Sequence, residues 1–281
     1  MKTIIAGLAL DGTDGPVLAR ARQLAGQHGA RLVLVHVLEA PPPGEAEGLD
    51  MAGARSLLEA DAAARLAALA GDLAGESRIV WGRPFEVLSG LIAAEKADLL
   101  VIGPGRPRSL RERIFGSTAD RLVRSAAIPV LVARRPAEEP YRRAVVAADL
   151  SAQSLSAAKA VRALAPQADV EHLHVVETPL SFEQALRRAG TPEASIARYR
   201  QARLAAARER LAAAFAGIDP LRLRLVHGQP REVLLRRARS RRVDLIALGT
   251  HGRDAAAQMI LGSVARGVLS AAACDVLVVA R

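Results

Sequence analysis

The feature that most constrains the fold is an internal repeat that runs through the whole chain. Near the start, IIAGLALD matches AVVAADL, and LVLVHVLE matches VEHLHVVE, both at an offset of 138 residues. Further along, WGRPFEVL matches HGQPREVL, ADLLVIG matches VDLIALG, and IPVLVAR matches CDVLVVAR, all at an offset of 146 residues. Two copies at so long a period indicate duplicated domains rather than a solenoid.

The boundary between the copies is expected in RRPAEEPYRR, at residues 134–143, because two prolines and mixed charges suit an exposed linker. We predict domains at residues 1–137 and 141–281. The chain has 281 residues and is 51% hydrophobic, which is enough for two separate cores. The eight additional residues of the second copy fall after its second predicted strand.

Each copy alternates short runs rich in Val, Ile and Leu with helical patterns, which is typical of a parallel sheet covered on both faces. In the first copy we expect strands at 3–10, 31–38, 77–81, 99–103 and 130–133, and helices at 15–28, 50–73, 84–95 and 117–126. The second copy is expected to repeat this order. Right-handed crossovers then predict an α/β fold with two doubly wound parallel sheets, and a ligand site at the carboxyl ends of the strands where the winding reverses.

Two polar features of each copy fall at that edge. Asp11 and Asp149 end the first predicted strand of their copies. A glycine-rich loop follows the fourth strand, GPGRPRSLRERIFGST in the first copy and GTHGRDAAAQMILGSV in the second. If strands one and four are neighbours, the aspartate and the loop of each copy face the same site.

The second loop has the chemistry of a phosphate site. Gly249 and Gly252 let the main chain approach a ligand closely. Gly262 and Ser263 begin a predicted helix, whose free N–H groups attract an anion. Asp149 can accept hydrogen bonds from a ribose hydroxyl, which would make the ligand a nucleotide. The Walker and GxGxxG patterns are both absent here, and glycine turns with an N-cap serine explain the same spacing without a ligand.

The pattern GxxG, nine residues, then GS resembles the ATP-binding signature of the universal stress protein family. DLSAQSLSAA, the HV of the second strand, HGQP and AACDVLVV extend the likeness, so the chain resembles a tandem universal stress protein with two UspA-like domains. The resemblance implies Rossmann-like, adenine nucleotide alpha hydrolase-like domains with five strands in the order 3-2-1-4-5. It also implies ATP as the ligand, with Mg²⁺ as a candidate companion and AMP or ADP as alternatives.

The resemblance transfers site residues to both copies. In the second copy the implied nucleotide contacts are Asp149, Val175 beside the adenine, Leu248, Gly249, Gly252, Arg253, Gly262, Ser263 and Val264. In the first copy they are Asp11, Val37, Gly103, Gly105, Gly116, Ser117 and Thr118. The first loop departs from the pattern, because Arg106 replaces a glycine and Pro104 removes a donor. Gly105 lies one position early, and the arginines of this loop can themselves contact phosphate. The sequence therefore favours the second site and leaves the first undecided.

Catalysis is not supported, because neither copy offers an obvious general base or a metal-holding pair of acids. The leading hypothesis is an ATP-binding regulatory protein of the stress response, not an enzyme, with slow hydrolysis at most. The alternative is a non-catalytic interaction scaffold with empty, degenerate nucleotide sites and an unknown protein partner. Nucleic-acid binding is disfavoured, because the formal charge of +10 predicts only non-specific attraction and aromatic residues make up 2% of the chain.

The remaining conspicuous residues favour structural roles. His36 and His174 lie on apolar strands, and no metal-ligand spacing is visible. Trp81 stands where the second copy has His227, which argues against a shared catalytic role. The single cysteine and the lack of a spanning apolar run predict a cytoplasmic protein without a membrane segment. The family resemblance further implies that residues 130–133 and 276–280 join the copies as an intramolecular pseudo-dimer, with a further homodimer as an option.

Overall fold

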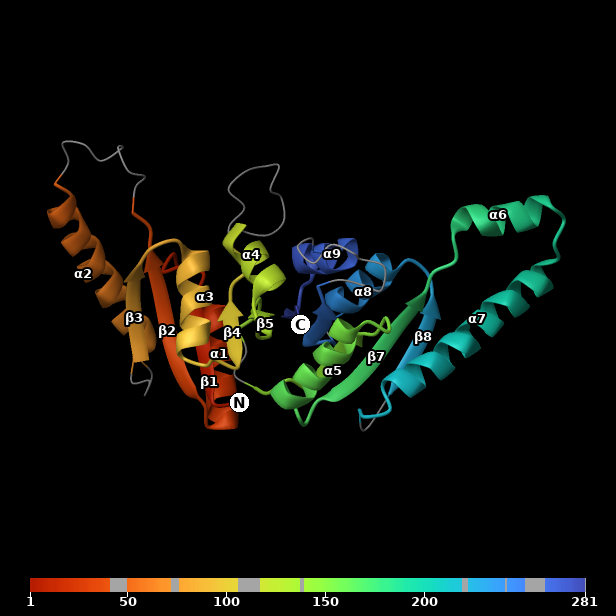
Figure 1. The fold of residues 1–281 in the computed structure, drawn as a ribbon, viewed down its shortest axis with the longest axis horizontal. Coiled ribbons are helices and arrows are strands. Elements are labelled where there is room, and N and C mark those ends of the chain that lie inside the picture. Colours follow the sequence, from red (N-terminus) through yellow and green to blue (C-terminus); the bar gives the residue numbers. More distant parts are fainter. Residues whose placement is uncertain are drawn as a thin grey trace. The chain divides into compact units, whose positions relative to one another are not determined.

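The computed structural model divides the chain into two compact units, Met1–Pro140 and Tyr141–Arg281 (Figure 1). It describes residues 1–40, 50–71, 76–105, 117–136, 139–218, 222–240, 242–250 and 261–280. Each unit contains a parallel sheet with helices packed on it, and the two are described in turn.

Unit 1 is a five-stranded parallel sheet in the order β3-β2-β1-β4-β5. Its strands are β1 (Thr3–Leu8), β2 (Arg31–Leu38), β3 (Glu76–Trp81), β4 (Leu99–Ile102) and β5 (Val130–Val132). Its helices are α1 (Gly15–His28), α2 (Met51–Ala70), α3 (Pro84–Ala94) and α4 (Ser117–Ser125). The predicted α/β class and the strand order 3-2-1-4-5 are confirmed.

Unit 2 has the same order in its own strands, β8-β7-β6-β9-β10, all parallel. The strands are β6 (Arg143–Ala147), β7 (Asp169–Val176), β8 (Leu223–His227), β9 (Leu245–Gly249) and β10 (Asp275–Val279). The helices are α5 (Ala152–Leu164), α6 (Leu180–Arg188), α7 (Glu193–Ala214), α8 (Pro230–Arg239) and α9 (Ser263–Ala271).

The prediction that the second copy repeats the element order of the first is wrong at one place. Between β7 and β8 the chain forms two helices, α6 and α7, where the described residues of unit 1 between β2 and β3 form one helix, α2. Gly190, with a φ of 77°, and Pro192, at the N-cap of α7, separate the two helices. A left-handed glycine ends one helix and a proline starts the next. The eight additional residues therefore lie in a segment that gained a helix.

Two elements of unit 1 are predicted two or three residues too long, for local reasons, and four others one residue too long. Strand β1 ends at Leu8 and not at residue 10, because Leu10 has a left-handed backbone with a φ of 54°. Helix α2 ends at Ala70, where the C-cap Gly71 has a φ of 52°. A single residue in the left-handed region is sufficient to end either kind of element.

The amino ends of the central strands are held by one aspartate in each unit. Asp98 accepts the main-chain N–H of Thr3 at 3.1 Å, and Asp244 accepts that of Arg143 at 2.9 Å. Hydrogen bonds from the backbone of Lys2 and Thr3 lower the pKa of Asp98. These aspartates belong to the repeated segments ADLLVIG and VDLIALG. The repeat of the aspartate is explained by its role, which is to hold the first strand beside the fourth.

The repeated Gly-x-Pro of WGRP and HGQP makes a tight entry into the third helix of each repeat. Gly82 and Gly228 have φ values of 149° and 146°, which residues with a side chain rarely adopt. Pro84 and Pro230 then begin α3 and α8. A Cβ added to Gly82 would also lie 2.8 Å from Cγ2 of Val87.

We predict that Gly82→Ala destabilises unit 1 by about 1–3 kcal/mol, because the backbone angle and the contact with Val87 are both unfavourable. Gly90→Ala is the matched control. Gly90 lies inside α3, and an added Cβ there meets nothing within 4 Å. It should be neutral or stabilising by about 0.5–1 kcal/mol. Urea unfolding followed by circular dichroism measures both, and equal effects of the two substitutions would contradict this account of the turn.

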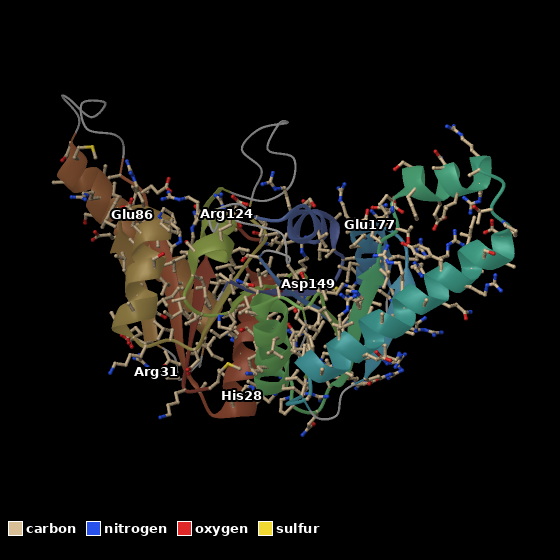
Figure 2. All side chains as sticks on the ribbon, turned by 45° about the vertical axis from the view of Figure 1, so that its right-hand side comes forward. His28, Arg31, Glu86, Arg124, Asp149 and Glu177 are labelled. Carbon is tan, nitrogen blue, oxygen red and sulfur yellow. The ribbon has the colours of Figure 1, made fainter. Side chains whose placement is uncertain are left out.

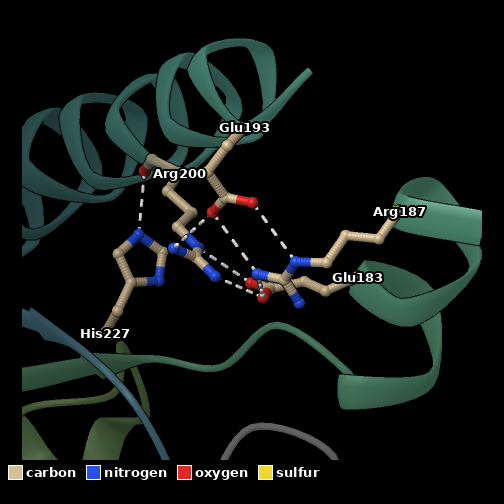
Figure 3. A network of polar contacts seen from close by, with 5 residues as sticks. All are labelled: Glu183, Arg187, Glu193, Arg200 and His227. Carbon is tan, nitrogen blue, oxygen red and sulfur yellow. Dashed lines mark hydrogen bonds and ion pairs between the residues drawn. The ribbon is translucent and has the colours of Figure 1, made fainter. Parts of the chain in front are cut away.

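The α6–α7 hairpin is held together by a network of ion pairs (Figure 3). Glu183 on α6, which is 7% exposed, receives two hydrogen bonds from Arg200 on α7, one of them 2.9 Å long. Arg187 contacts Glu183 at 3.5 Å and Glu193 at 3.2 Å. His227 at the end of β8 donates Nε2–H to the carbonyl of Arg200 at 2.9 Å, which ties the hairpin to the sheet.

Acid should loosen this hairpin in a defined range. The hydrogen bond from Arg200 lowers the pKa of Glu183 below its ordinary value, in spite of the opposing effect of burial. A lowered folded-state pKa means that the stabilisation is complete above the ordinary pKa of about 4.3 and is lost as the pH falls through the folded value.

We therefore predict that Glu183→Gln increases hydrogen exchange across α6 and the start of α7 at pH 7, and that its difference from wild type shrinks below about pH 4. Glu193→Gln is the control, since that side chain is 62% exposed and an exposed pair contributes little. A larger effect from Glu193→Gln would argue against Glu183 as the centre of the network.

Candidate functional site

The topology brings the predicted site elements to one edge in each unit. Strand β1 pairs with β4, and β6 pairs with β9, so the loops after these strands leave neighbouring carboxyl ends. Asp149 lies two residues beyond β6, and Gly249 is the last residue of β9. Figure 2 shows Asp149 beside the start of α5, with Glu177 at the carboxyl end of β7. This edge is where the winding of the sheet reverses, the usual ligand position in such folds.

Asp149 is held by a local turn. Its Oδ1 accepts the N–H of Ser151 at 3.0 Å and the hydroxyl of Ser151 at 2.5 Å. Asp11 makes the same contacts with Thr13, at 2.9 and 2.5 Å. An aspartate two residues before a serine or threonine is a turn signal. Within the part of the chain that the structure describes, Oδ2 of Asp149 has no hydrogen-bond partner, and one side of the carboxylate remains for a ligand.

The two ends of the second glycine loop are joined. The N–H of Gly262 donates to the carbonyl of Thr250 at 2.9 Å, and the N–H of Thr250 donates to Val279 on β10 at 3.2 Å. The loop therefore leaves and returns at one point of the sheet. Sequence reasoning did not identify Thr250, which is 1% exposed and carries no chemical motif.

Helix α9 begins without a side-chain cap. Gly262 is its N-cap, and Ser263 is its exposed first residue. Gly262 and Ser263 therefore stand at the beginning of the helix as expected, but the ligand-free alternative of an N-cap serine does not apply, because Ser263 already lies within the helix. Among the described residues no acceptor is found for the N–H groups of Ser263, Val264 and Ala265. Such an uncapped start carries a partial positive charge and suits an anion.

Gly249 is also needed for packing. A Cβ there would lie 2.5 Å from Cβ of Gln153 and 3.3 Å from its main-chain carbonyl carbon, so β9 passes too close to α5 for any side chain. The matching Gly103 is different, since its Cβ would lie an ordinary 3.5 Å from Val17. A close contact within the fold thus explains one glycine that the sequence reading assigned to a ligand.

The other predicted residues of the second site are distributed as follows. Leu248 is 2% exposed within β9, so its side chain belongs to the core. Val175 and Val264 are half-buried, near the end of β7 and in the first turn of α9. Gly252 and Arg253 lie outside the described residues.

The predicted residues of the first site are only partly described. Val37 and Thr118 are half-buried, on β2 and in α4. Gly105 has a φ of 73°. Ser117 begins α4, while Gly116 and the arginines 106, 108, 111 and 113 lie outside the described residues.

Unit 1 also contains an acid that unit 2 lacks. Asp14, at the N-cap of α1, is 4% exposed, and its Oδ1 accepts the N–H of Ala9 at 2.7 Å. Its Oδ2 is buried without a hydrogen-bond partner among the described residues. The matching residue of unit 2 is Ala152. A carboxylate at this edge disfavours a nearby phosphate.

The histidines and Trp81 have structural partners. His36 and His174 donate Nδ1–H to the carbonyls of Leu8 and Ala148, at 2.9 and 2.6 Å. Trp81 donates Nε1–H to Glu59 on α2, as His227 donates to α7. These two ring N–H groups anchor the helix or hairpin that precedes their strands. Cys274, the single cysteine, is fully buried and forms no disulfide, and no cluster of three metal-ligating side chains occurs among the described residues.

We predict that Gly249→Ala destabilises unit 2 by about 1–3 kcal/mol without any ligand, because overpacking against Gln153 must be relieved by a shift of α5. Gly103→Ala, the matched substitution in unit 1, should change stability by less than about 0.5 kcal/mol. Thermal unfolding of nucleotide-free protein measures both. If the Gly249→Ala protein is as stable as wild type, packing against Gln153 does not require the glycine, and ligand binding is its remaining explanation.

Comparison with known proteins agrees with the repeat. A profile of the universal stress protein family matches residues 1–134 and again 140–280. A universal stress protein of Thermus aquaticus is 34% identical over 139 residues, which are 47% of this chain and 98% of that protein.

Two solved structures share the fold over nearly the full length. A putative universal stress protein from Pseudomonas aeruginosa UCBPP-PA14 has a TM-score of 0.63 at 20% identity, covering 99% of this chain and 93% of its own. One from Archaeoglobus fulgidus DSM 4304 has a TM-score of 0.61 at 16% identity, covering 98% and 97%. With both copies matched by the family profile, the chain belongs to the universal stress protein family.

Proposed function

We propose that unit 2 binds an adenine nucleotide, ATP first of all, and that the chain is a nucleotide-binding regulatory protein of the stress response. The observation that carries this proposal is the uncapped start of α9 at the carboxyl edge of the sheet. Three N–H groups there have no acceptor among the described residues, and the helix dipole adds positive charge. A phosphate chain satisfies both.

Asp149 supports the nucleotide over a simple anion. Its Oδ1 is used by Ser151, so Oδ2 remains available to accept a hydrogen bond from a ligand hydroxyl. A ribose provides such hydroxyls, whereas inorganic phosphate has no comparable apolar part to lie against Val175. Mg²⁺ would arrive with the ATP, and AMP or ADP would occupy the same site with fewer phosphate contacts.

A regulatory role fits the side chains better than an enzymatic one. In this proposal Oδ1 of Asp149 serves the turn and Oδ2 the ribose, while His174 donates Nδ1–H to a carbonyl, so neither residue is placed as an efficient general base. We expect slow ATP hydrolysis at most. Nucleotide binding would then regulate the protein through the loop that starts at Thr250, because a bound nucleotide changes the surface that this loop offers to a protein partner.

Unit 1 is better suited to the alternative role of an interaction scaffold. Its buried Asp14 opposes a phosphate, and Pro104 removes a main-chain donor from its loop. Under this proposal unit 2 binds the nucleotide and unit 1 binds a protein partner.

None of the described helices is long and apolar enough to span a membrane. A cytoplasmic location, the pseudo-dimer and the identity of the protein partner stay predictions.

We predict that Asp149→Asn weakens ATP binding about tenfold or more, because a charge-assisted hydrogen bond to the ribose is lost while the turn with Ser151 is kept. Asp11→Asn is the matched control in unit 1 and should leave the measured affinity unchanged. Isothermal titration with ATP, after mass spectrometry of any ligand released from purified protein, is the measurement.

Two results would remove the proposal. One is wild-type protein that is empty on purification and binds no ATP. The other is an unchanged affinity in both Asp149→Asn and Gly252→Asp, since an acidic side chain in the loop must repel phosphate.

A further inference from the structure

Unit 2 buries a histidine that no part of the proposed nucleotide site uses. His172 lies on β7 and is 0% exposed, and neither Nδ1 nor Nε2 has a hydrogen-bond partner among the described residues. Its strand neighbours are Val146 on β6 and Leu223 on β8. A buried imidazole without partners is costly even when neutral, and far more costly when charged.

The repeat shows that a histidine is not required at this position of the fold. The matching residue of unit 1 is Leu34, also 0% exposed, on the matching strand β2. Two residues further on, each strand has a histidine, His36 or His174, in the same kind of hydrogen bond to a carbonyl. The two strands therefore differ in one buried ionisable group.

His172 packs directly against the residue that fastens α7. Phe215 follows α7 as its C-cap, is 0% exposed, and meets the imidazole edge-on with ring centroids 5.8 Å apart and an interplanar angle of 70°. Of the 22 residues of α7, the buried ones are Ile196, Ala207 and Leu211. Together with Ala207 and Leu211, the contact of Phe215 with His172 therefore packs this end of α7 on the sheet.

The surroundings of the imidazole ring, burial first of all, oppose its protonation. Burial is the main cause that lowers the pKa of His172, and the positive charge of Arg162 on α5 lowers it further, while the carbonyl of Arg222 beside β8 acts in the opposite direction. On its own strand, Glu171 is directed to Arg237 on α8 and Arg224 on β8. The neighbours from β6 and α7 are the apolar Val146 and Phe215.

We propose that His172 is an acid-sensitive latch, which keeps Phe215 and the end of α7 on the sheet of unit 2 only while the imidazole is neutral. Protonation of the ring requires water, and water reaches it only when Phe215 and α7 separate from β7. Mild acid therefore favours an opened unit 2 and leaves unit 1 closed. This device is independent of nucleotide binding.

The sign and the range follow from linkage. A folded-state pKa below the ordinary value of about 6.5 means that the opened form binds more protons, so stability falls as the pH falls below 6.5. The opening equilibrium should increase about tenfold per pH unit there, and about 30-fold in all between pH 7.5 and 5. The Glu183 network acts at lower pH, so the two effects are separable.

Hydrogen exchange of the full-length, nucleotide-free protein between pH 7.5 and 5 tests the latch, with rates corrected for intrinsic exchange. Protection of β7 and of the segment around Phe215 should fall about 30-fold, while protection of β2 around Leu34 stays constant. His172→Leu, which installs the residue of unit 1, should abolish the dependence. His174→Gln, on the same strand, should keep it.

A wild-type protein with constant protection over this range, or a His172→Leu protein with an unchanged slope, would overturn the proposal. Should His172→Leu fold poorly, the wild-type imidazole can be titrated directly by NMR of its ring carbons. A ring that stays neutral until unit 2 opens supports the latch, and one that titrates near 6.5 in closed protein overturns it.

Discussion

The pairing of the first with the fourth strand of each repeat is the constraint on which the rest of the structure depends. It places β1 beside β4 and β6 beside β9, and it creates the point where the winding of each sheet reverses. Asp98 and Asp244 reinforce it by binding the backbone at the amino ends of β1 and β6. At the carboxyl ends the same pairing brings an aspartate turn and a glycine loop to one edge. Without it these segments, about 100 residues apart in sequence, would not meet at one edge of the sheet.

Because the chain contains two copies of one fold, each position in one unit has a natural comparison in the other. The comparison separates what the fold requires from what one unit has added. Both units keep the Asx turn, the Gly-x-Pro entry into the third helix and a ring N–H that anchors the preceding helical segment. Asp14 in unit 1 and His172 in unit 2 have no counterpart, and each is a buried ionisable group that brings a cost in stability.

Glycine shows how far a motif can be interpreted by itself. Gly249 belongs to the family loop pattern, and ligand approach is sufficient to explain it in the sequence. The structure adds the close passage of β9 over Gln153, which excludes a side chain whether or not a ligand is present. Ser263 is the opposite case, in which the structure removes a structural explanation. It is the first residue of α9 and not its N-cap, so its side chain does not cap the free N–H groups of the helix.

The sequence by itself determined the duplication, the α/β class, the strand order through family resemblance, and the positions of Asp149 and the loop relative to the strands. These properties are periodic or local, so a single chain displays them. Only the tertiary structure decided that α6 and α7 are separate helices, that the N-cap position of α9 is Gly262 and not Ser263, and that His172 is buried against Phe215. These depend on which atoms approach one another across elements distant in sequence, and neither hydrophobic pattern nor residue type determines such contacts. The sequence shows that His172 replaces the Leu34 of unit 1, but only the tertiary structure shows that the imidazole is buried against Phe215.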